Sequence, residues 1–334
     1  MLYPQQNELR NLLDLSGIWD FQLDPGAVGD TEAWFLGLPS PRPIAVPGSW
    51  NEQYADAFNY LGKAWYARKF HIPRGWQGQR VCLRFGSANY AARVWLNGQL
   101  LGAHLGGHLP FEFEITPDLH WSEGNYLTVE VENELTPTRI PPGNVNSPMN
   151  LVSGSYPNTN YDFFPYAGLH RPVLLYSVPQ TYIADITVTT AIQGSEGVVQ
   201  ARVQAVGEPS RGELQLSTPD GSLSAPLLFN AGIAEAVLHV PEARFWSPDD
   251  PFLYELVVTL NQGARVIDRY QLEIGIRTVE VRGTQLLLNG QPTFLKGCAR
   301  HEDFYASGRG LNLPLMVKDL SLLKWLGANS YRTS

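Results

Sequence analysis

Charge is sparse in this sequence, and basic charge is the scarcer kind. Charged residues make up 17% of the 334 residues, and 24 Lys and Arg face 32 Asp and Glu, for a formal net charge of −8. No run of Lys or Arg forms a basic patch, so nucleic acid is not an expected partner. No apolar run approaches the roughly 20 residues that cross a bilayer, so no membrane partner is expected either.

Cysteine and targeting signals are also scarce. The two cysteines, Cys82 and Cys298, each lie in an apolar, strand-like run, and we expect two reduced, buried thiols. The first residues lack a basic region followed by an apolar core, so no signal peptide is expected. The sequence contains no Asn-x-Ser/Thr sequon. These features favour a soluble, cytoplasmic protein.

Motifs for several chemistries are missing as well. The absence of a P-loop, a Gly-x-Ser-x-Gly elbow and a Gly-x-Gly-x-x-Gly turn disfavours NTPase, serine hydrolase and dinucleotide-binding functions. His104 and His108 flank Gly106-Gly107, and a His-x₃-His pair can bind zinc when it lies on a helix with a third ligand nearby. In a glycine-bearing connection we interpret the pair as structural, and we expect neither a metal nor another cofactor.

Short alternating runs dominate the first 275 residues, among them "AWYARKFHI", "RVCLRFG", "YLTVEVEN" and "RPVLLYSV". Asn97-Gly98 and Asp220-Gly221 separate such runs, and both pairs tolerate the positive φ angles of tight hairpins. The pattern predicts an antiparallel sandwich over residues 1–180. Further strand-like runs at spacings of roughly 10 to 20 residues predict a smaller, immunoglobulin-like sandwich over 181–277.

The pattern changes after Arg277. The run "TFLKGCA" lacks strict alternation, as in a strand buried on both faces. In "NLPLMVKDLSLLKWLG", Asn312 can cap a helix, Pro314 suits its first turn, and Gly327 can end it. A further strand, "NSYRTS", completes one βαβ unit of a parallel α/β fold. A closed (β/α)₈ barrel, for example, needs about 250 residues and fewer than 60 remain, so this last segment looks unfinished.

Several motifs follow one another along the chain: "AVPGSW" (45–50), "VWLNG" (94–98), "NELTPTRIPPG" (133–143), "YDFFPYAGLHRPV" (161–173), "KGCARHED" (296–303) and "WLGANSYRTS" (325–334). In order and spacing they resemble the family 2 glycoside hydrolases, and within these the β-glucuronidases, with Pro165 standing where that family has Asn. The resemblance covers essentially all residues. It implies a jelly-roll sugar-binding domain (1–180), an immunoglobulin-like sandwich (181–277) and the start of a catalytic barrel (278–334).

Retaining glycoside hydrolysis needs two carboxyl groups about 5–5.5 Å apart. The family carries them in Asn-Glu-Pro and Glu-Tyr-Gly-like motifs late in the barrel, and neither motif occurs in this sequence. Glu302-Asp303 is the most tempting acidic pair, but neighbours on an extended chain point to opposite sides, so we do not interpret it as the catalytic dyad. We therefore expect no catalytic carboxylate in this chain and no activity of the chain alone.

The resemblance implies three supporting residues. Asp162 matches the position that binds glycone hydroxyls through charge-assisted hydrogen bonds, the alternative being an Asp that caps a loop turn. His301 follows the first barrel strand and is expected beside the glycone, the alternative being a structural histidine. Arg332 matches the arginine on the second barrel strand that forms an ion pair with the nucleophilic glutamate and does not itself contact the sugar. In the family "RTS" continues with His-Tyr-Pro, and the chain stops one residue short of that histidine.

The implied partner is a β-glucuronide or related carbohydrate, and the parent enzyme is expected to be a homo-oligomer. Two alternatives stay open. Jelly rolls and immunoglobulin-like domains often act only as carbohydrate-binding or scaffold modules, so the chain could be self-sufficient in that role. Another uronide specificity, such as galacturonides, is also compatible, because the family reads the sugar carboxylate with an Asn-x-Lys motif that would lie beyond Ser334.

Overall fold

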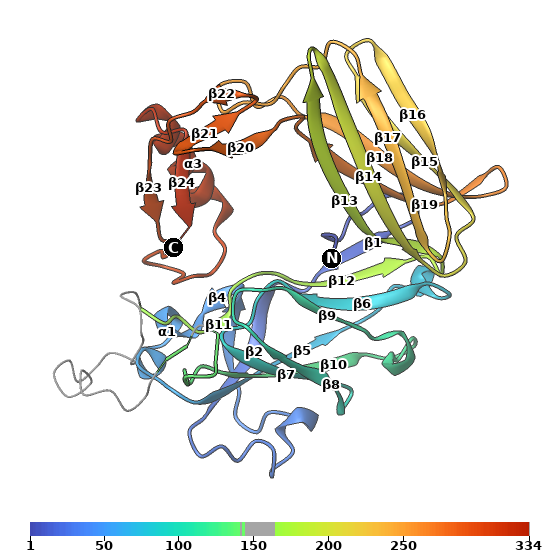
Figure 1. Ribbon diagram of the computed structural model, residues 1–334. Coiled ribbons are helices and arrows are strands. Elements are labelled where there is room, and N and C mark those ends of the chain that lie inside the picture. Colours follow the sequence, from blue (N-terminus) through green and yellow to red (C-terminus); the bar gives the residue numbers. More distant parts are fainter. Residues whose placement is uncertain (141, 144–163, 334) are drawn as a thin grey trace. The chain divides into compact units, whose positions relative to one another are not determined.

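The computed structural model describes residues 1–140, 142–143 and 164–333, and its strands dominate the ribbon (Figure 1). The predicted fold class is confirmed: mainly β, with two sandwiches followed by the opening βαβ unit of a barrel. The chain packs as two compact units. One consists of Leu12–Ser177 and His301–Val317, and the other of Met1–Asn11, Val178–Arg300 and Lys318–Ser334.

The first sandwich pairs a four-stranded sheet with a six-stranded sheet. In spatial order, the smaller sheet holds β1 (Asn11–Asp14), β12 (Val173–Val178), β6 (Arg80–Phe85) and β9 (Phe111–Glu114). The larger holds β3 (Arg42–Val46), β2 (Gly17–Asp24), β5 (Lys63–Phe70), β10 (Asn125–Glu132), β7 (Ala91–Leu96) and β8 (Gln99–Leu105). A separate antiparallel pair joins β4 (Gly48–Ser49) to β11 (Gly168–Leu169).

Short helical turns lie between these strands. They are α1 (Trp50–Gln53) and the 3-10 turns η1 (Trp34–Leu36), η2 (Ala55–Ala57), η3 (Arg74–Trp76) and η4 (Thr116–Asp118). The predicted hairpin at Asn97-Gly98 joins β7 to β8, because Leu96 pairs with Gln99. Both turn residues have positive φ, 52° and 81°, which matches the twist of the flanking strands.

The core of this sandwich is built from strands that alternate between buried and exposed residues and from strands such as β6 that are buried nearly throughout. In β2, Trp19 and Phe21 are buried while Ile18 and Asp20 are exposed. A second apolar cluster of Trp34, Trp65 and Trp95 forms apart from the main core. Burying an aromatic side chain of this size removes about 150–250 Å² from water, worth roughly 4–6 kcal/mol, so these rings contribute much of the cohesion.

The second sandwich is built from longer strands. One sheet has the order β13 (Tyr182–Gln193), β14 (Glu196–Val206), β17 (Ile233–Val240). The other has the order β16 (Gly221–Leu228), β15 (Arg211–Thr218), β18 (Tyr254–Gln262), β19 (Arg265–Ile274). In β14, Val199, Ala201 and Val203 are buried and the residues between them are exposed, so one face of the sheet packs on the core. The hairpin near Asp220-Gly221 is present, but Thr218 pairs with Gly221, which makes Pro219-Asp220 its two-residue loop.

The chain after Arg277 first forms a small antiparallel sheet of β20 (Val279–Arg282), β21 (Gln285–Leu288) and β22 (Gln291–Pro292). The predicted βαβ unit follows as β23 (Gly297–Arg300), α3 (Leu313–Trp325) and β24 (Ser330–Thr333), with β23 and β24 parallel. The Asn312 side chain caps α3 by accepting from the Leu315 amide at 3.2 Å, and Gly327, with φ +82°, follows its end. No residue of α3 is buried, so this unit covers neither of its apolar faces.

One sequence expectation about cysteine is wrong. Cys82 is buried, but Cys298 on β23 is exposed, because a sheet of only two strands leaves that side chain uncovered. Both are free thiols, as expected. Within the described residues, no helix has the length and apolar character that crossing a membrane requires.

Candidate functional site

The structure describes two of the three predicted site residues. Asp162 lies outside the described residues, so its role stays a prediction. His301 directly follows β23 and is exposed. Arg332 lies on β24, in register with Ala299 of β23, and is also exposed. Both described residues thus sit near the carboxyl end of a parallel strand, the position that carries functional groups in (β/α)₈ barrels. Their roles remain predictions.

The acidic pair after His301 is bound to two different arginines. Arg171 donates to a carboxylate oxygen of Glu302 at 2.7 Å. The Nε of Arg309 donates to Asp303 at 2.9 Å. Each carboxylate is therefore bound by a different guanidinium, and the expectation that this pair is not a catalytic dyad stays a prediction.

These contacts belong to a longer stretch, residues 301–311, which we term the docking segment. It packs on the first sandwich at the connection around β4 and β11. The Arg309 amide donates to Ser49 Oγ at 3.0 Å, and the Leu311 amide donates to the His170 carbonyl at 2.9 Å. The Ser49 amide in turn donates to the Ser307 carbonyl at 3.4 Å. Main-chain bonds in both directions thus fix the segment to the sandwich.

His170 is the buried centre of this contact, with only 2% of its surface exposed. Its Nε2 and Ser49 Oγ lie 3.0 Å apart and share a hydrogen bond. Burial, with a further contribution from Arg171, lowers the pKa of His170 to about 3. The imidazole is therefore neutral at pH 7, and the Ser49 hydroxyl links the Arg309 amide to the His170 ring.

Two glycines allow this close approach. A side chain at Gly308, whose φ is +53°, would place its Cβ 2.5 Å from Ser49 Oγ. A Cβ at Gly310 would lie 2.8 Å from the Cα of Gly48. Real Cβ atoms essentially never come within 3.0 Å of other heavy atoms, so the stretch Gly308-Arg309-Gly310 approaches this surface closely because both glycines lack a side chain.

The histidine pair considered for zinc is engaged otherwise. His104 donates from Nε2 to the Gly106 carbonyl at 3.0 Å and stacks on Phe111, with ring centroids 4.2 Å apart. Local burial, then the charge of Arg309, lowers the pKa of His108 to about 4, although part of that residue is exposed. In the described part of the chain, no three His, Cys, Asp or Glu side chains gather as a metal site would require.

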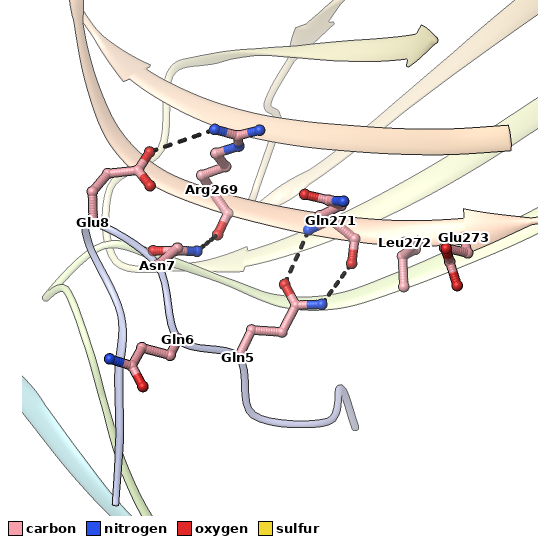
Figure 2. Close-up of a pocket in the computed structure, with 8 residues that line it drawn as sticks. All are labelled: Gln5, Gln6, Asn7, Glu8, Arg269, Gln271, Leu272 and Glu273. Carbon is pink, nitrogen blue, oxygen red and sulfur yellow. Dashed lines mark hydrogen bonds and ion pairs between the residues drawn. The ribbon is translucent and has the colours of Figure 1, made fainter. Parts of the chain in front are cut away.

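A polar cavity of about 670 Å³ lies in the other unit, where the first residues of the chain pass strand β19 (Figure 2). The Gln5 side chain donates to the Gln271 carbonyl at 2.6 Å and accepts from its amide at 3.1 Å. Asn7 donates to the Arg269 carbonyl at 3.0 Å. The side chains of Gln5 and Asn7 in Figure 2 therefore bond the main chain at the edge of β19 in place of another strand. Neither His301 nor Arg332, the two described site residues, lines this cavity, whose lining is Gln5, Gln6, Asn7, Glu8, Arg269, Gln271, Leu272 and Glu273.

The docking contacts were not found from the sequence. Ser49 and His170 lie within motifs that carry the family resemblance, yet 121 residues separate them, and only folding shows that they bond. The pattern Gly308-Arg309-Gly310 was the one local signal, since closely spaced glycines often mark a tight approach of two backbones.

Three family models match the chain in succession. Residues 12–179 match the glycosyl hydrolases family 2 sugar binding domain, residues 181–277 match glycosyl hydrolases family 2, and residues 279–334 match the glycosyl hydrolases family 2 TIM barrel domain.

Curated relatives include the β-glucuronidases of Paenibacillus borealis, 40% identical over 344 residues, and Rattus norvegicus, 39% identical over 358 residues. Each alignment covers 100% of this chain but 56% and 55% of the relative, so the chain spans about half of their length. Among solved structures, a Ruminococcus gnavus β-glucuronidase in complex with D-glucuronic acid is 34% identical with a TM-score of 0.91, and the match covers 100% of this chain and 57% of that one.

Proposed function

The chain belongs to glycosyl hydrolases family 2, and we propose that it is the amino-terminal part of an enzyme that hydrolyses β-D-glucuronides with retention. The observation that carries this proposal is the likeness to β-glucuronidases along the whole chain, in sequence and in structure. A solved relative binds D-glucuronic acid, which supports a glucuronide as the substrate class.

Under this proposal the chain supplies groups that bind the sugar and orient the catalytic carboxylate, but not the groups that break the glycosidic bond. The carboxylate of Asp162 accepts hydrogen bonds from the glycone hydroxyls. His301, at the end of the first barrel strand, lies beside the glycone. Arg332 holds the nucleophilic carboxylate of the complete barrel ionised and oriented.

The chemistry of retention argues that the chain is inactive alone. One carboxylic acid must protonate the leaving oxygen while a facing carboxylate attacks the anomeric carbon. Glu302 and Asp303 are not proposed for these roles, because neighbours on an extended chain point to opposite sides and cannot both face one glycosidic bond. No cofactor is required, since both steps need only carboxyl groups and water.

Two measurements on the purified chain test the proposal, after expression in a host that lacks β-glucuronidase. With p-nitrophenyl β-D-glucuronide we expect no turnover above a mock purification, and activity that follows the chain through a second column would contradict the inactivity. By calorimetry we expect D-glucuronate to bind, and Asp162→Asn to weaken binding about tenfold or more, since a charge-assisted hydrogen bond is worth about 1.5–3 kcal/mol. Asp56→Asn, in an exposed ion pair with Arg42, is the matched control and should bind normally.

The alternative is a stand-alone carbohydrate-binding or scaffold module. The observation in its favour is that each sandwich has its own apolar core. Glucuronate binding that survives both Asp162→Asn and His301→Gln would favour this alternative, because the sugar site would then lie elsewhere on the sandwiches. Galacturonate binding as tight as glucuronate binding would indicate another uronide specificity within the same family.

A further inference from the structure

Arg171 contacts the docking segment at two separated points. Its Nη2 donates to Glu302 Oε2 at 2.7 Å, and its Nη1 donates to the Arg309 carbonyl at 3.0 Å. Arg171 lies between β11 and β12, so a single guanidinium ties the first sandwich to residues on both sides of the turn that the segment makes. Only the planar fork of arginine presents donors for both bonds at once.

Arg309 completes the arrangement from within the segment. Only 9% of its surface is exposed, its Nε holds Asp303, and its amide donates to Ser49 Oγ. The two arginines therefore hold Glu302 and Asp303, the second and third of the three residues that follow β23, at the same surface of the sandwich. His301, the first of these residues, is exposed, while its neighbour Glu302 is held in place.

The pairing also changes the charge beside His301. Without the guanidinium of Arg171, the Glu302 carboxylate would lose the cation that binds it at 2.7 Å, and the negative charge beside His301 would increase. A uronide is an anion, and like charges disfavour its approach. The arginines thus reduce the repulsion of an anion at the position where the proposed substrate is expected.

We propose that Arg171 is a positioning residue for the glycone site: it holds Glu302, and through it the backbone that presents His301 and the local charge that a uronide meets. This inference rests on the proposed function and deepens it. The sugar-binding domain sets the geometry of the first barrel loop, in addition to whatever sugar contacts it makes itself.

Amide hydrogen exchange on the full chain tests the contact itself. Arg171→Gln should speed exchange of the Arg309 and Leu311 amides by roughly threefold to tenfold, as expected for loss of a partly exposed ion pair together with one hydrogen bond. Glu302→Gln changes the same pair without altering the sandwich, and should give a smaller increase. Arg42→Gln is the matched control, because its side chain is 31% exposed against 33% for Arg171 and its ion pair is 2.8 Å long, so these amides should keep their wild-type rates.

The imidazole resonances of the 7 histidines test the positioning. The His301 signal, assigned by its loss in His301→Gln, should shift or broaden in Arg171→Gln and stay fixed in Arg42→Gln. Arg171→Lys should restore the wild-type His301 signal in part, since lysine keeps the positive charge opposite Glu302 but lacks the second nitrogen that donates to the Arg309 carbonyl. A His301 signal that does not move, or exchange rates that do not change, would overturn the inference.

Titration with D-glucuronate separates this inference from the proposed function. If the wild-type chain binds D-glucuronate, Arg171→Gln should weaken that binding severalfold while Arg42→Gln does not. Binding that is unchanged in Arg171→Gln would overturn the positioning role. A wild-type chain that binds no D-glucuronate, yet shows the exchange and resonance changes, would count against the proposed function and support the positioning of His301.

Discussion

Replacing Asp268 by asparagine should destabilise the second sandwich by about 3–5 kcal/mol, because it leaves Arg10 as a buried cation without its counter-charge. The side chain of Asp268 is 0% exposed and that of Arg10 is 5% exposed. Their two parallel hydrogen bonds measure 2.8 Å from Nε to Oδ1 and 2.6 Å from Nη2 to Oδ2. This pair fastens the first eleven residues of the chain to β19.

The magnitude follows from the contacts that asparagine cannot keep. Asp268 Oδ2 also accepts from the Ile183 amide at 2.7 Å, and Arg10 donates to the Ile183 carbonyl at 2.8 Å. An asparagine retains one acceptor oxygen, so at least one charge-assisted hydrogen bond is lost, worth about 1.5–3 kcal/mol. The uncompensated charge of Arg10 accounts for the remainder.

Urea unfolding of the wild type, Asp268→Asn, Arg10→Met and the double variant measures this loss, with exchange of the slowest amides of β14 and β18 reporting on the second sandwich alone. The double variant should lose clearly less free energy of unfolding than the sum of the losses of the two single variants, because it leaves no buried charge without a counter-charge. Arg244→Gln removes an exposed ion pair of the same unit and should leave the midpoint unchanged.

Two results would refute this reasoning. One is a loss below about 1 kcal/mol for Asp268→Asn, which would mean that water or relaxation compensates the buried cation. The other is strict additivity of the two single changes, which would mean that Arg10 and Asp268 do not stabilise each other.

Three further predictions concern the docking segment and the thiols. Gly310→Ala should weaken docking by about 1–3 kcal/mol, seen as faster local exchange, whereas Gly75→Ala, with no atom within 4 Å of its new Cβ, should be neutral. The folded-state pKa of His170, about 3, lies below the unfolded value near 6.5, so the unfolded chain takes up the proton first as the pH falls. The free energy of unfolding is therefore at its full value above pH 6.5 and should fall by about 2 kcal/mol by pH 5. In His170→Gln, the urea midpoint should depend on pH less steeply by this amount. A thiol reagent should label Cys298 at once but Cys82 only after unfolding, since burial raises the Cys82 pKa to about 11, and two fast thiols would contradict this.

Features that depend on neighbouring residues could be predicted from the sequence. The Asn97-Gly98 hairpin follows from the tolerance of both residues for positive φ, and the helix α3 follows from the cap at Asn312 and the stop at Gly327. The second hairpin was predicted, but its loop is shifted by one residue to Pro219-Asp220, because strand register is decided by cross-strand pairing as well as by the turn.

Burial of the second thiol was mispredicted for a physical reason. The apolar run around Cys298 does form a strand, and such a run is typical of a strand covered on both faces. Covering it requires partners that the two-stranded sheet of β23 and β24 does not have. A sequence pattern reports what a segment would bury, and only the packing shows what covers it.

By itself the sequence determined the order of strands and turns, the family motifs and the identity of the candidate residues, because periodicity and motif spacing are properties of short stretches of chain. The tertiary structure alone decided that Glu302 and Asp303 are held by Arg171 and Arg309, and that the docking segment meets Ser49 and His170. These partners lie up to 260 residues apart, and a hydrogen bond between them depends on distances of about 3 Å that no local pattern encodes.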